Sequence, residues 1–67
     1  MNKVKETRNK LGWTQAKLAA MTGGTLTQGD ISKLETDYYK RPTPKIKREV
    51  AKALGIPESE LFPQNGG

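Results

Sequence analysis

The amino-acid sequence predicts an all-α fold, because apolar residues recur at helical spacing and Gly and Pro stand at the borders of those runs. Only 33% of the residues are hydrophobic, yet the ordered pattern favours a folded domain over a disordered chain. A chain of 67 residues can hold one small core. We therefore expect a single compact domain over residues 1–62, followed by a disordered tail over residues 63–67.

The first predicted helix covers residues 3–11, and the glycine that follows ends it. Val4, Arg8 and Leu11 are spaced i, i+4, i+7 and should share the inward face. A charged side chain on an inward face normally needs a buried partner. Glu35 is the candidate partner for Arg8.

The second predicted helix runs from Gln15 to Met21, with Thr14 as its N-cap. If the start of this helix faces a phosphate, free N–H groups would hold it and Gln15 would add a donor. The alternative is that Gln15 is an ordinary first-turn residue. Trp13 has two interpretations as well, since it either stacks on a nucleotide or packs on the core.

A Gly-rich connection, TGGTL over residues 22–26, separates this helix from the third. It is not a phosphate-binding loop, because Asp30 and Ile31 stand where that motif requires Lys and Ser/Thr. The connection is therefore expected to be a plain turn. Thr27 and Asp30 then fit a capping box at the start of a third helix, which extends to Glu35.

The third helix has a small polar outer face. Ile31 and Leu34 are three residues apart, so both can be buried on one side. Gln can pair with adenine and Lys with guanine when a helix lies in the major groove of DNA. The residues expected to face the bases are Gln28, Gly29, Ser32 and Lys33.

Residues 36–43 form a predicted loop rich in Tyr and basic side chains. Lys40 and Arg41 are expected to contact phosphates. The neighbouring Tyr38 and Tyr39 either lie along a nucleic-acid backbone or pack at least one ring on the core.

A fourth helix is expected after this loop, with Thr43 as its N-cap, Pro44 as its first residue and a glycine at its end. Ile46, Val50 and Leu54 provide its apolar stripe, whereas its basic residues Lys45, Lys47, Arg48 and Lys52 should be solvated. A last short turn, residues 57–62, adds Leu61 and Phe62 to the core.

Composition excludes several functions. The chain has no Cys and no His, which rules out disulfides, zinc sites with sulfur or imidazole ligands, and Cys/His or Ser/His catalysis. We expect no enzyme activity, no metal and no cofactor. There is no apolar run near the ~18 residues that span a bilayer and no signal peptide. A cytoplasmic protein without membrane contact is expected.

The net charge of +5 is unevenly distributed. Residues 1–17 carry five Lys and Arg, residues 40–52 carry six, and the segment between them is mildly acidic. Two basic segments suit a polyanion that is bound at two places. The alternative is that these cations only solvate helix surfaces.

The order of these pieces resembles the phage-repressor-and-Cro-type, or lambda-repressor-like, helix-turn-helix family. The likeness covers roughly residues 4 to 62 and is carried by TQ at the second helix, ISKLE at the end of the third, KRPTP before the fourth and AKALGI-x-x-x-ELF at the end. It implies a compact five-helix domain that binds double-stranded DNA, often as a homodimer on a palindromic site. A transcriptional regulator, most simply a repressor, is the implied function.

Site residues follow from the same resemblance. Gln28, Gly29, Ser32 and Lys33 match base-facing positions, and Arg8 and Glu35 match a buried ion pair of several members. Positions that match or flank backbone-facing ones are Thr14, Gln15, Thr27, Thr36, Lys40 and Arg41.

The chain departs from the family pattern in three places. The turn over residues 22–26 is longer than the usual link, Lys47 stands at a usually apolar position, and Gly29 replaces a side chain that often reads a base. These departures motivate an alternative function, an antitoxin-type or adaptor domain whose main partner is a protein.

Overall fold

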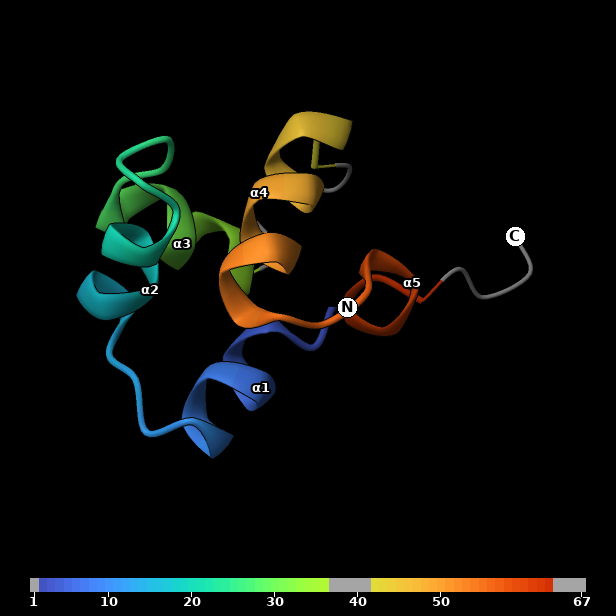
Figure 1. The fold of residues 1–67 in the computed structure, drawn as a ribbon, viewed down its shortest axis with the longest axis horizontal. Coiled ribbons are helices and arrows are strands. Elements are labelled where there is room, and N and C mark those ends of the chain that lie inside the picture. The colour runs from blue at the N-terminus through green and yellow to red at the C-terminus, as the bar shows by residue number, and fades with distance from the viewer. Residues whose placement is uncertain (1, 37–41, 64–67) are drawn as a thin grey trace.

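The computed structural model describes residues 2–36 and 42–63, and these form five α-helices and no strand. In Figure 1, α2 and α3 lie side by side, α4 stands next to them, α5 lies on the far side of α4, and α1 lies below the lower end of α4. None of the helices in the described ranges is long and apolar enough to cross a bilayer. The predicted all-α class is confirmed. The helices are α1 Val4–Lys10, α2 Gln15–Met21, α3 Gln28–Glu35, α4 Pro44–Leu54 and α5 Glu58–Leu61.

One hydrophobic core holds these helices together, and every helix contributes to it. Packing runs from α2 to α3 and α4, and from α4 to α1 and α5. Truncating a fully buried Leu or Ile to Ala in such a core costs about 2–5 kcal/mol. The buried apolar residues are Val4, Leu18, Ala19, Leu26, Ile31, Leu34, Val50, Ala51, Leu54 and Leu61.

The expectation that Leu11 is buried was wrong, because its side chain is 46% exposed. The chain leaves the helix at this residue, which is the C-cap of α1. Gly12 adopts a φ of 72°, and the next N–H, that of Trp13, donates to the Arg8 carbonyl at 3.1 Å. This is the hydrogen-bond pattern of a Schellman ending, and it turns the chain away from the inward stripe.

Trp13 packs against the core at this corner. Its ring is half-buried beside the core cluster, and Lys17 Nζ lies 5.8 Å from the ring centroid. Of the two interpretations, core packing therefore describes this side chain.

The longer turn between α2 and α3 is organised by one buried hydroxyl. Thr22 Oγ1 donates to the Ala19 carbonyl at 2.6 Å and accepts from Leu26 N at 3.1 Å. Between these residues, Gly23 and Gly24 have φ values of 72° and 87°, which residues with a Cβ rarely adopt. The extra length is therefore folded into a compact bend, and Leu26 returns to the core.

The fourth helix begins as expected, with the Thr43 hydroxyl accepting from Ile46 N at 3.2 Å and Pro44 in its first turn. Lys47 departs from the expectation of a solvated side chain, since it is half-buried. Its Nζ lies 5.7 Å from the centroid of the Phe62 ring. An ammonium group at this distance from an aromatic ring is attracted to it, so a basic residue is accommodated at this position.

Candidate nucleic-acid interface

The third helix begins with a complete capping box. Asp30 N donates to Thr27 Oγ1 at 3.1 Å, and Thr27 N donates to Asp30 Oδ2 at 2.9 Å. Both bonds satisfy backbone groups that have no partner within the helix. The acidic residue at the start of α3 therefore has a structural use.

The two sides of α3 differ as the spacing predicted. Ile31 and Leu34 are 0% and 1% exposed and form part of the core. Gln28, Gly29 and Lys33 are exposed on the surface, and Ser32 is half-buried. The helix thus presents polar and basic side chains to solvent and is anchored by apolar ones.

The end of α3 is held by a buried ion pair with α1. Arg8 Nε donates to Glu35 Oε2 at 2.7 Å, and Arg8 Nη2 donates to Glu35 Oε1 at 3.1 Å. The two side chains are only 10% and 2% exposed. The hydrogen bond with Glu35 raises the pKa of Arg8 above its ordinary value, burial opposes this rise, and the attraction of the carboxylate adds to it. Arg8 is therefore a permanent cation.

Two further bonds extend this pair into a network. Arg8 Nη1 donates to the Trp13 carbonyl at 2.7 Å, and Gln15 Nε2 donates to Glu35 Oε1 at 3.1 Å. The network joins α1, the α1–α2 corner, the first residue of α2 and the last residue of α3. Such fully satisfied buried polar groups hold the elements in one arrangement.

Comparison with known families decides what this arrangement is. Residues 4–61 match the sequence model of a protein family whose description is Helix-turn-helix. The chain belongs to this lambda-repressor-like helix-turn-helix family. It is a DNA-binding domain of a regulatory, typically non-enzymatic class. No curated protein and no solved structure matched the chain.

In this helix-turn-helix, α2 and α3 are the two helices of the motif, and α3 stands in the position of the recognition helix. Thr14 and Thr27 are exposed, and each hydroxyl accepts a bond from a backbone N–H in the following turn. A hydroxyl that accepts still has its own proton to donate, so both remain suited to a phosphate.

The other expected backbone contacts differ from these two. Thr36 Oγ1 donates to the Ser32 carbonyl at 3.0 Å and lies 3.4 Å from the Lys33 carbonyl, so its proton is already used within the recognition helix. Gln15 uses an N–H of its side-chain amide for the hydrogen bond to Glu35. Lys40 and Arg41, like Tyr38 and Tyr39, lie outside the described residues.

Sequence reasoning missed how the amino-terminal residues support the recognition helix. Asn2 Nδ2 donates to the Leu34 carbonyl at 3.0 Å, and Asn2 Oδ1 accepts from Val4 N at 3.0 Å. Lys3 N donates to the Leu61 carbonyl at 2.9 Å. An Asn shortly before a helix is a capping signal, but no local pattern indicates a bond that spans 32 residues.

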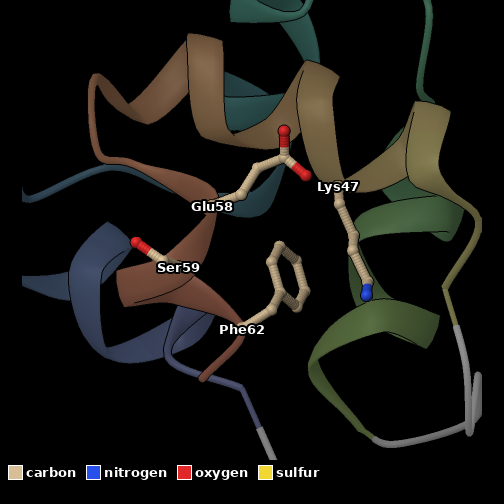
Figure 2. Close-up of a pocket in the computed structure, with 4 residues that line it drawn as sticks. All are labelled: Lys47, Glu58, Ser59 and Phe62. Carbon is tan, nitrogen blue, oxygen red and sulfur yellow. The ribbon is translucent and has the colours of Figure 1, made fainter. Parts of the chain in front are cut away.

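A shallow opening of about 370 Å³ lies between α4 and α5. Figure 2 shows the Phe62 ring in its middle, with Lys47 on one side and Glu58 and Ser59 on the other. No group of three or more His, Cys, Asp or Glu side chains within the described ranges is arranged to hold a metal ion. The recognition helix and its supporting network therefore remain the candidate functional site.

Proposed function

We propose that this domain is a sequence-specific transcriptional regulator, a repressor of the cytoplasm, that inserts α3 into the major groove of double-stranded DNA. The observation that carries the proposal is the two-sided character of α3. Its apolar side is buried in the core while Gln28, Gly29 and Lys33 are exposed. A helix that is anchored on one side can enter a groove without losing its own packing.

The roles of the exposed residues follow from their chemistry. The Gln28 amide donates and accepts toward adenine, Lys33 donates to guanine, and the half-buried Ser32 adds a short hydroxyl. Gly29 reads no base, and its exposed surface lets the backbone approach the groove closely.

Phosphate contacts come from both sides of the recognition helix. Thr14 and Gln15 lie at the start of α2, and Thr27 caps α3. Thr36 ends α3, and its hydroxyl would have to release the Ser32 carbonyl before it could donate to a phosphate. Lys40 and Arg41 add two cations from the segment before α4. Such contacts fix the position of the domain on the duplex, while the side chains of α3 select the sequence.

The test is selection of bound duplexes from a random pool. A single enriched sequence is expected, and a palindromic one is expected because we propose that the domain binds as a homodimer. Gln28→Ala and Lys33→Ala should change which bases are enriched. Lys52→Ala is the matched control for Lys33, because it removes the same charge from an exposed position of α4. If the wild-type domain enriches no sequence, the proposal is wrong.

A second candidate function is an antitoxin-type or adaptor domain whose main partner is a protein. It is favoured by the long turn at Gly23 and Gly24 and by Gly29, which contributes no side chain to base recognition. Co-purification of one defined protein partner, together with no footprint on DNA at micromolar protein, would establish this function instead.

A further inference from the structure

The two helices of the motif are joined at both ends, by a covalent link at one and by a hydrogen bond at the other. The turn connects the last residue of α2 to the first residue of α3. At the opposite end, the first residue of α2 is Gln15 and the last residue of α3 is Glu35. Gln15 Nε2 donates to Glu35 Oε1 at 3.1 Å across this open end.

The hydrogen bonds of the covalent end do not reach the recognition helix, although Leu26 at the end of the turn packs in the core. The buried Thr22 hydroxyl bonds to Ala19 and Leu26, so it orders the bend and the end of α2 but makes no bond to α3. The first turn of α3 is capped by its own Thr27 and Asp30. The direction of α3 relative to α2 is therefore set by core packing and by contacts at the open end.

The Glu35 side chain is held in one position at that end. Its side chain is 2% exposed, and both of its oxygens accept bonds from Arg8. Arg8 is itself tied to the Trp13 carbonyl at 2.7 Å. Because a carboxylate only accepts, the Gln15 amide must turn its nitrogen toward Glu35, which gives its side chain one orientation.

We propose that Glu35 is a positioning residue for DNA recognition, and that its hydrogen bond with Gln15 sets the direction in which α3 enters the groove. Core packing holds α3 against α2, and the Gln15–Glu35 bond restricts the remaining rotation. When α3 has a single orientation, its base-reading side chains meet the same base pairs each time the domain binds. The bond should therefore increase the difference in affinity between the selected sequence and other sequences. This inference rests on the proposed function.

Gln15→Met tests it, because Met keeps the length and packing of the side chain and removes the donor. Glu35 stays paired with Arg8 in this variant, so no buried carboxylate is left alone. The ratio of affinities for the selected duplex and for an unrelated duplex should fall by about threefold to tenfold, the range that one hydrogen bond accounts for. Loss of the proposed Gln15 phosphate contact should lower both affinities alike, and the ratio removes this common loss.

Two matched variants isolate the hydrogen bond. Gln15→Lys restores a donor to Glu35 and should restore the ratio, although its added charge strengthens binding to both duplexes. Ala20→Met places the same new side chain at an exposed position of α2 away from Glu35 and should leave the ratio unchanged.

The role of Glu35 is tested in a background without the ion pair. Arg8→Met combined with Glu35→Met replaces the buried pair by apolar side chains of similar size, a change that buried pairs often tolerate. The double variant should show the same reduced ratio, and adding Gln15→Met to it should cause no further loss.

Two results would overturn the inference. An unchanged ratio in Gln15→Met would mean that the bond does not position α3, and if both affinities fell equally, Gln15 would be only a phosphate donor. Independent, additive losses in the combined variant would show that Glu35 does not act through Gln15. Failure of the wild-type domain to prefer any duplex would instead refute the proposed function, and this inference with it.

Discussion

Arg8 and Glu35 form a bidentate ion pair between residues 27 positions apart in the chain, with 2.7 Å between Arg8 Nε and Glu35 Oε2. The pair is largely buried, at 10% and 2% exposure of the two side chains. It links α1 to the end of the recognition helix. Burying two charges is costly, and the cost is offset only while both are present and hydrogen-bonded.

The first prediction concerns the loss of one partner. Arg8→Met should lower the free energy of unfolding by about 3–5 kcal/mol, because it leaves a buried carboxylate without its counter-charge. Arg8→Met combined with Glu35→Met should lie within about 1 kcal/mol of the wild-type domain. Urea unfolding followed by circular dichroism measures both. A single variant as stable as the double variant would contradict this account.

The second prediction concerns pH. The pKa of Arg8 is raised in the folded state, so its contribution to stability is fully present below the pKa of the unfolded chain and is lost only as pH rises through the folded value. The difference in unfolding free energy between wild-type and the Arg8→Met, Glu35→Met variant should therefore stay constant from about pH 8 to pH 11. A difference that shrinks across this range would show that Arg8 loses its proton there.

The third prediction concerns the start of the recognition helix. Thr27→Ala should lower the free energy of unfolding by about 1 kcal/mol, because it removes the hydroxyl that accepts from Asp30 N. Thr27→Ser keeps the acceptor and serves as the control, with stability expected near that of the wild type. Thermal and urea unfolding of the three proteins provide the comparison, and equal losses for Ala and Ser would rule out the capping role.

The fourth prediction compares two glycines. A Cβ added at Gly29 meets only Thr27 Oγ1 at 3.7 Å, so Gly29→Ala should stabilise the helix by about 0.5–1 kcal/mol. Gly55 has a φ of 71° at the end of α4, so Gly55→Ala should destabilise the domain by about 1 kcal/mol. Differences in urea midpoint at constant slope report both effects. The same sign for both substitutions would contradict the argument.

The fifth prediction separates base recognition from phosphate binding. Lys33→Ala should cost about 1–3 kcal/mol on the selected duplex and relax the preference at one base pair. Lys40→Ala should weaken binding to every duplex alike and reduce the slope of log affinity against log salt by about 0.9. Titrations at several salt concentrations, on the selected duplex and on single-base variants of it, test both. Indistinguishable behaviour of the two variants would remove their assigned roles.

Local signals in the sequence predicted most of the helix ends correctly. Thr14, Thr27 and Thr43 each accept a bond from the first turn of the helix that follows. These features depend on residues three or four positions apart, which a single sequence displays directly. The buried side of α3 at Ile31 and Leu34 follows from spacing in the same way.

The errors at Leu11 and Lys47 have different causes, a local helix ending in the first case and a contact with a distant residue in the second. Leu11 fits the inward spacing of α1, yet the helix ends there and the side chain is 46% exposed. Lys47 looks like a solvated residue of α4, but it lies beside Phe62 of the last turn. Helical spacing predicts which residues share a face of the helix. It does not predict which residues of another segment pack against that face.

The sequence by itself determined the all-α class, the helix boundaries marked by caps and glycines, and the candidate pairing of Arg8 with Glu35. Only the tertiary structure decided that Gln15 also bonds to Glu35 and that Asn2 supports the end of α3 through the Leu34 carbonyl. The physical reason is range. Caps and stripes are local properties of a helix, whereas these bonds require the packing that brings α1, α2 and the end of α3 together.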